Sequence, residues 1–176
     1  MPQVVHEIEK PKRVALLRKL MIAAVLLLVV TAGAVVLIVR LTAPKVTLNQ
    51  LEDIKRQAAV MNMRGDLAGA LKLYDTAIAH ADSDTTTGNL YLDKAVLELN
   101  AKILDGAGKD ALVSEKLLKG DSPSAFVATV YLAQGDKVKA AQHLRTAAER
   151  ANKNGPAGPS KQSYLNKAVM LEQGTP

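Results

Sequence analysis

The chain has 176 residues, 48% apolar and 23% charged, and its lack of cysteine excludes a disulfide framework, a zinc–thiolate site and a thiol nucleophile. The formal net charge of +6 is concentrated at the N-terminus, because residues 1–45 hold seven basic and two acidic side chains (+5) and the other 131 residues hold 16 basic and 15 acidic ones (+1). A near-neutral body argues against a nucleic-acid surface, which needs a clustered basic face.

Residues 21–39 form the longest apolar stretch of the chain, 19 residues without a charge. As a helix this stretch would span roughly 28 Å, close to the hydrocarbon thickness of a bilayer. Lys19 and Arg40 flank it, where their side chains could reach headgroups. A buried core helix and a cleaved signal peptide are the alternatives, but large Leu41 stands where a signal-peptide cleavage site needs a small residue. We therefore predict a transmembrane helix over residues 20–41.

The charges that flank this stretch predict its orientation. Five Lys or Arg lie between Lys10 and Lys19, whereas Arg40 and Lys45 are the only two in the segment that follows, before Lys55. Retention of the more basic side in the cytoplasm makes residues 1–19 a basic cytoplasmic tail and places the C-terminal body outside. The prediction is a single-pass protein of the cell (inner) membrane, with lipid contact through residues 21–39. The reversed topology, with a cytosolic body, is the alternative.

The first part of the body has the pattern of two paired helices. Thr47 and Gln50 have the spacing of a capping box. Gly65 is suited to the left-handed end of a helix, and Asp66 is suited to cap the next one. Apolar positions recur every three or four residues on both sides of this turn, and they are Leu51, Ile54, Ala58 and Met61, then Leu67, Ala70, Leu71, Tyr74, Ala77 and Ile78.

The same pattern returns 70 residues later. Ser122 and Pro123 read as an N-cap and a first-turn proline, and Gly135 and Asp136 read as the turn. The two apolar stripes there are Phe126, Val127, Val130 and Tyr131, then Val138, Ala141, Leu144, Ala147 and Ala148.

A third, more degenerate pair is expected between these two. Leu90 to Ile103 suits a first helix, the Gly106–Gly108 segment suits a turn, and Ala111 to Leu118 suits a second helix. After a break at residues 154–159, a last amphipathic helix begins at Ser160. Such a helix would cap the apolar face that a stack of repeats leaves uncovered.

The alignment of the two clear pairs carries a resemblance to a known family. Gly65-Asp66-x3-Ala70-x3-Tyr74-x2-Ala77 matches Gly135-Asp136-x3-Ala140-x3-Leu144-x2-Ala147, at an offset close to twice a period of about 34 residues. This pattern resembles the tetratricopeptide repeat (TPR) family. The resemblance implies a short TPR-like α-solenoid of about three helix pairs with a C-terminal capping helix, over residues 47–173. Together with the transmembrane helix predicted from the apolar stretch, the expected fold is all-α. A generic antiparallel helical bundle is the alternative.

No motif in the chain predicts catalysis, a metal site or a cofactor. His80 and His143 have no second ligand at helical spacing, and we interpret them as solvated or locally bonded. A phosphate loop around Lys109 would need a glycine where Ile103 stands and a serine or threonine where Asp110 stands. The segment after Asp82 lacks the glycine of a calcium loop. We therefore expect no enzyme activity.

The TPR resemblance implies a concave groove that binds peptides, lined by the first helix of each pair. The family's carboxylate clamp is matched at Lys55 but not at Ala59, Ser122 or Phe126, so an extended peptide or a partner helix is expected instead. The predicted function is a membrane-anchored protein-interaction scaffold or assembly factor, which binds proteins or peptides and no nucleic acid. A structural subunit of a larger membrane, envelope or secretion complex is the alternative, and an enzyme or sensor is a more distant one. The candidate groove residues are Lys55, Ala59, Asn62, Leu97, Asn100, Ala125, Thr129 and Leu132.

Overall fold

The computed structural model describes residues 21–22, 24–27, 30, 45–151 and 161–174. The chain divides into two compact units, Met1–Pro44 and Lys45–Pro176. In the second unit the described residues are helical, without a strand beyond one isolated bridge between Val46 and Ala81. The elements, in order, are η1 (Leu48–Gln50), a 3₁₀ turn, and the helices α2 (Leu51–Met63), α3 (Leu67–Ala79), α4 (Asp84–Asn100), α5 (Leu104–Leu118), α6 (Asp121–Ala133), α7 (Lys137–Arg150) and α8 (Lys161–Glu172).

The prediction of a transmembrane anchor is corrected by the structure. Of the predicted span, residues 21–22, 24–27 and 30 are described as helical with exposed side chains, and the rest of it, like the predicted tail 1–19, lies outside the described residues. No helix in the described part of the chain is both long enough and apolar enough to cross a bilayer. A span needs about 20 predominantly apolar residues, whereas the longest helix among the described residues, α4, has 17 residues in all and contains Asp93, Lys94 and Glu98. The predictions of a single-pass membrane fold and of an inner-membrane location with an extracytoplasmic body are therefore wrong.

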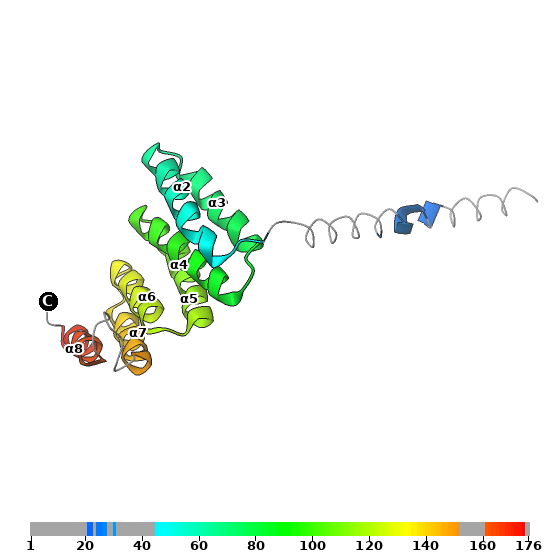
Figure 1. The fold of residues 1–176 in the computed structure, drawn as a ribbon. Helices are drawn as coiled ribbons and strands as arrows, with labels where there is room; N and C mark the ends of the chain where they lie inside the picture. The colour runs from blue at the N-terminus through cyan, green and yellow to red at the C-terminus, as the bar shows by residue number, and fades with distance from the viewer. Residues whose placement is uncertain (1–20, 23, 28–29, 31–44, 152–160, 175–176) are drawn as a thin grey trace, which may run out of the picture. The chain divides into compact units, whose positions relative to one another are not determined.

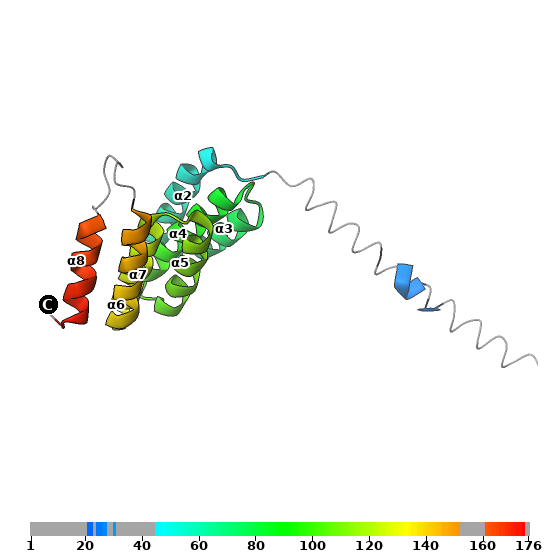
Figure 2. The same ribbon diagram turned by 90° about the horizontal axis from the view of Figure 1, so that it is seen from below.

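The helices of the second unit follow one another in a stack. Each helix packs mainly against the helices that precede and follow it in the chain, as both views show for α4 to α8 (Figures 1 and 2). Among the described residues, the buried side chains form three local clusters along the stack, with no common centre. A series of local cores is typical of stacked repeats, in which each unit contacts only its neighbours. The second unit therefore has an all-α, helical repeat-like fold.

The two inter-helix turns that the sequence aligns have the same geometry. Gly65 has φ 83° and Gly135 has φ 82°, which is the left-handed region. The carboxylate of Asp66 accepts a hydrogen bond from the backbone N–H of Gly69 (2.8 Å), and that of Asp136 accepts one from Lys139 (3.0 Å). Each aspartate is thus the N-cap of the helix that follows, which confirms the sequence prediction.

The aligned residues beyond each turn are buried, as predicted. Four of these six residues are alanines, which let neighbouring helices approach closely, while Tyr74 and Leu144 fill the remaining space. The buried set is Ala70, Tyr74 and Ala77 in α3 and Ala140, Leu144 and Ala147 in α7.

Replacement of Gly135 by alanine is expected to lower the free energy of unfolding by about 1–2 kcal/mol, the cost of a left-handed L-residue. An added Cβ would meet no atom within 4 Å, so backbone strain is the whole effect. Gly174 also has a positive φ (70°) and open space, but it lies two residues beyond the end of α8 and joins no two described helices, so Gly174→Ala is the matched control. Urea unfolding measures the free energy of unfolding of both variants. Equal losses would contradict the assignment of Gly135 to a turn that the fold depends on.

The predicted turn of the middle pair is wrong. α4 ends at Asn100, the connection is residues 101–103, and Gly106 and Gly108 both lie inside α5. A Cβ on Gly106 would lie 2.9 Å from Oε1 of Glu98, and a Cβ on Gly108 would lie 3.2 Å from Nε2 of Gln134. The glycines therefore mark close helix contacts rather than a break in the helix.

Two further predictions, one of a helix boundary and one of a buried position, differ from the structure. α6 begins at Asp121 with Gly120 as its N-cap, so Ser122 is inside the first turn rather than before it, and Pro123 is still in that turn. In α7 the side chain of Val138 is 69% exposed, although the sequence places it on the apolar stripe. Val138 is in the first turn of α7, next to the inter-helix turn.

Candidate binding site

The predicted groove residues are divided among three helices. Lys55, Ala59 and Asn62 lie on α2, and the latter two are exposed. On α4, Asn100 is exposed and Leu97 packs against the N-terminal core cluster. The Lys55 ammonium is engaged by Glu52 (3.2 Å) and by Asp93 of α4 (3.6 Å), so it links two helices.

The three predicted residues of α6 line a surface hollow of about 230 Å³. We call it the α6–α8 hollow, because α6 and α8 form its walls and α7 contributes Leu144. Its remaining lining residues were not among the predicted groove residues. The full lining is Ala125, Ala128, Thr129 and Leu132 of α6, Leu144 of α7, and Ser163, Tyr164 and Lys167 of α8.

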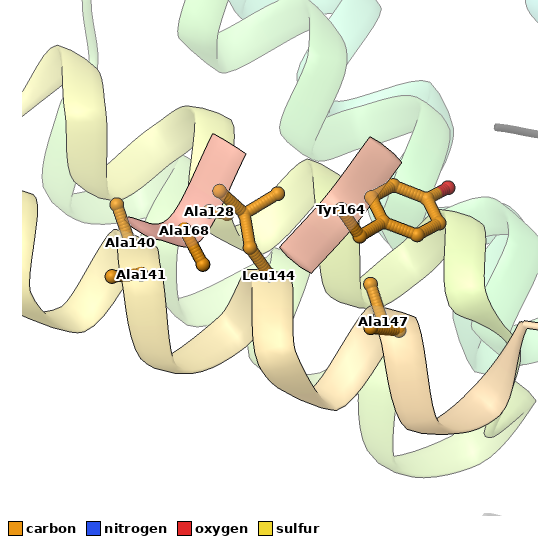
Figure 3. Close-up of a cluster of buried hydrophobic side chains, with 8 residues drawn as sticks. Ala128, Ala140, Ala141, Leu144, Ala147, Tyr164 and Ala168 are labelled. Atoms are coloured by element: carbon orange, nitrogen blue, oxygen red, sulfur yellow. The ribbon is translucent and has the colours of Figure 1, made fainter. Parts of the chain in front are cut away.

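The floor of the hollow is apolar, because small and large apolar side chains meet there. Ala128 of α6, Leu144 of α7 and Tyr164 of α8 belong to one buried cluster (Figure 3). All three are buried, and the alanines at 125 and 128 leave space that larger side chains would fill.

Tyr164 is held in place at the wall of the hollow by a polar contact. Its hydroxyl donates a hydrogen bond to Oδ2 of Asp121, at 3.2 Å, across from α8 to the start of α6. Burial raises the pKa of the Tyr164 hydroxyl, and the charge of Asp121 adds to this effect. The ring is therefore oriented by an uncharged donor, with its apolar face available to the hollow.

The sequence pattern predicted only part of this site. It predicted a last amphipathic helix after residues 154–159, but the contact of this helix with the first-helix groove was not predicted. Ser163 and Lys167 were missed because nothing local indicates that a helix beyond residues 152–160 docks beside α6.

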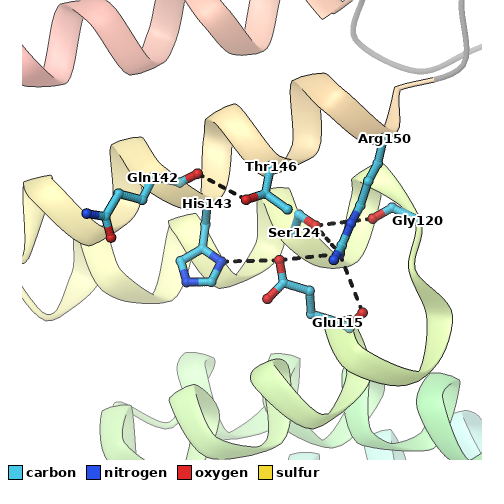
Figure 4. Close-up of polar contacts among 7 residues, drawn as sticks. All are labelled: Glu115, Gly120, Ser124, Gln142, His143, Thr146 and Arg150. Carbon is cyan, nitrogen blue, oxygen red and sulfur yellow. Dashed lines mark hydrogen bonds and ion pairs between the residues drawn. The ribbon is translucent and has the colours of Figure 1, made fainter.

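A polar network joins α5, α6 and α7 elsewhere in the stack (Figure 4). The Glu115 carboxylate lies 3.2 Å from Nδ1 of His143 and 3.5 Å from Nη1 of Arg150. Arg150 also donates to the Ser124 hydroxyl oxygen (2.8 Å), and this hydroxyl donates to the Gly120 carbonyl (3.2 Å). Ser124 is fully buried with its hydroxyl engaged on both sides, so this arrangement has the geometry of a structural network rather than of an exposed nucleophile.

His143, predicted as solvated or locally bonded, is half-buried and also stacks on Tyr131, with ring centroids 5.4 Å apart. Over the residues that the structure describes, no group of three or more His, Asp or Glu is placed to hold a metal ion. Asp82, the first residue of the calcium-loop pattern, accepts hydrogen bonds from the hydroxyls of Ser83 and Thr86 beside the start of α4.

Comparison of the chain with protein-family models, with curated proteins and with solved structures yields no match. The TPR assignment made from the sequence is therefore wrong. The spacing of glycine, aspartate and alanine that suggested the family is explained by the local needs of a turn, an N-cap and close helix packing, which any stack of helix pairs shares.

Proposed function

We propose that the Lys45–Pro176 unit is a protein-interaction module whose α6–α8 hollow receives one apolar side chain of a partner segment. The single observation that carries this proposal is the preformed hollow with a buried apolar floor, at Ala128 and Leu144. Its volume of about 230 Å³ is below the usual size of small-molecule sites, roughly 300–1,000 Å³. A cavity of about 150 Å³ accepts benzene, so one leucine or phenylalanine side chain is a suitable occupant.

The charge at the hollow favours a partner segment with an acidic residue beside the apolar one. Lys167 is the only charged residue of the lining, and its side chain is exposed. A carboxylate near this ammonium would favour association and fix the register of the segment, although an exposed pair adds little affinity. The proposal includes no catalytic step.

The test is a selection from a random peptide library with the full chain as bait. We expect the selected peptides to share an apolar residue next to Asp or Glu, and Ala125→Phe, which fills the hollow, to weaken their binding at least tenfold in fluorescence polarisation. The matched control is Ala133→Phe, on the same helix but outside the lining. Equal binding by both variants would disprove the role of the hollow.

A second candidate function is a structural subunit of a larger assembly. It is favoured by the face of α2, where Arg56, Gln57, Val60 and Met61 surround an open, mostly apolar depression of about 300 Å³. Met63, two residues further, is one of the most exposed large apolar side chains of the unit. Sedimentation velocity distinguishes the two: a peptide-binding module is expected to be monomeric, whereas a subunit with an uncovered face is expected to self-associate.

A further inference from the structure

Three acidic side chains converge on a single lysine where α3, α4 and α5 meet. Lys94 of α4 lies 2.8 Å from Oδ1 of Asp75 in α3 and 3.0 Å from Oδ2 of Asp110 in α5. Glu98, one turn further along α4, has its Oε1 4.0 Å from the same ammonium. We call these four residues the Lys94 cluster. With all groups ionised, it holds three negative charges against one positive charge.

Glu98 is the least solvated member of the cluster. The residue is 6% exposed, and its Oε2 is buried without a hydrogen-bond partner. Its carboxyl group lies against the first turn of α5, where a Cβ added to Gly106 would meet it at 2.9–3.0 Å. Oδ2 of Asp110 makes an ion pair with Lys94 but no well-directed hydrogen bond. The lysine therefore neutralises Asp75 and Asp110 more closely than it does Glu98.

The helix α2 also packs against α4, but it does not change the charge balance of the Lys94 cluster. From α2, the cation Lys55 is engaged by Glu52 and by Asp93 of α4.

Burial raises the pKa of Glu98 to about 7, and the nearby Asp110 charge acts in the same direction, while Lys94 opposes it. A neutral Glu98 can donate a hydrogen bond through its O–H to an adjacent carboxylate, whereas an ionised one adds a buried, unpaired charge.

We propose that the Lys94 cluster is a proton-responsive switch that holds α5 closed against α4 when Glu98 is neutral and loosens this junction when Glu98 ionises. The proton is released to solvent, and no other group needs to react. The switch is a property of the fold and is independent of the proposed binding function.

The direction of the pH effect follows from the raised pKa of Glu98. In the opened junction its pKa returns toward the ordinary value of 4.5, so the closed form binds the proton more tightly. The closed junction is therefore at its most stable at low pH, weakens as the pH rises from about 4.5 to 7, and changes little above that range. From pH 5.5 to 8.5 the opening equilibrium is expected to increase roughly 30-fold.

Hydrogen exchange of the full chain tests the switch, with exchange rates corrected for the intrinsic effect of pH. We expect the protection of the Ala107 and Ala111 amides in α5 to fall roughly 30-fold from pH 5.5 to 8.5, and that of Leu144 in α7 to stay constant. Glu98→Gln is expected to abolish the change, and Glu149→Gln, at an exposed carboxylate of α7, to preserve it. Unchanged protection in the wild-type chain, or the same fall in Glu98→Gln, would overturn the proposal.

A direct titration keeps the proposal testable if Glu98→Gln does not fold. The carbon resonance of the Glu98 carboxyl group, followed by NMR in the wild-type chain, reports its protonation state. A midpoint near pH 7 supports the switch, and a midpoint near 4.5 overturns it.

Discussion

Replacement of Lys94 by methionine is expected to lower the free energy of unfolding by about 3 kcal/mol at pH 8. Methionine keeps most of the length of the side chain but removes the only cation of the Lys94 cluster. Burial lowers the pKa of Lys94, but its contacts with Asp75 and Asp110 outweigh this and raise the pKa overall, so the ammonium is charged at every relevant pH. Without it, Asp110 and Glu98 remain as carboxyl groups beside each other with little access to water.

The loss in Lys94→Met is expected to be smaller at pH 5 than at pH 8. The lysine lowers the pKa of Glu98, so its removal raises this pKa further and extends the range in which the neutral form is kept. At low pH a bound proton on Glu98 replaces part of the missing positive charge. The stability of the variant should therefore decrease more steeply with pH than that of the wild-type chain, as measured by urea unfolding at a series of pH values.

Lys55→Met is the matched control, because Lys55 also joins two helices through carboxylates. Its side chain is 42% exposed, and Glu52 is more exposed still, so solvent screens the interaction. We expect a loss below about 1 kcal/mol with little dependence on pH. If Lys55→Met and Lys94→Met were equally costly, burial of the Lys94 cluster would not be the cause.

The elements that the sequence predicted well are those with a local physical requirement. A glycine at positive φ followed by an N-cap aspartate specifies a turn through the backbone alone, so Gly65 and Gly135 located two inter-helix turns correctly. The spacing of small residues then located the buried faces of α3 and α7.

The middle of the stack could not be predicted in the same way. Gly106 and Gly108 have the local signature of a break, but in the structure they allow close contacts with Glu98 of α4 and with Gln134 at the C-terminal end of α6. The actual turn contains Lys102 at φ 62°, a conformation that a lysine seldom adopts. Lysine carries no local signal for this conformation, so the sequence did not indicate where the chain turns.

The candidate site was predictable in part for a similar reason. Ala125, Thr129 and Leu132 share one face of α6 by helical periodicity, so their common location follows from spacing. Ser163 and Lys167 belong to the same hollow only because α8 docks on α7, and the cluster of Ala140, Leu144 and Tyr164 holds it there. The Lys94 cluster was missed entirely, because its members look like ordinary surface charges along three different helices.

Leu144→Ala is the second substitution with a large expected effect, and it links the core to the α6–α8 hollow. Leu144 is 2% exposed and packs within the cluster that joins α6, α7 and α8. Truncation of a buried leucine costs about 2–5 kcal/mol, depending on how far the surroundings collapse. The space left here would merge with the open hollow and admit water, so a value of about 3 kcal/mol is expected.

Val138→Ala is the control for Leu144→Ala on the same helix. Its side chain is 69% exposed, so its removal should change the free energy of unfolding by less than about 0.5 kcal/mol. Both substitutions lie on α7 and remove aliphatic carbon atoms. They differ mainly in how deeply the replaced side chain is buried. If urea unfolding gave equal, small losses for both, α8 would not be packed over Leu144, and the floor of the hollow would not exist in solution.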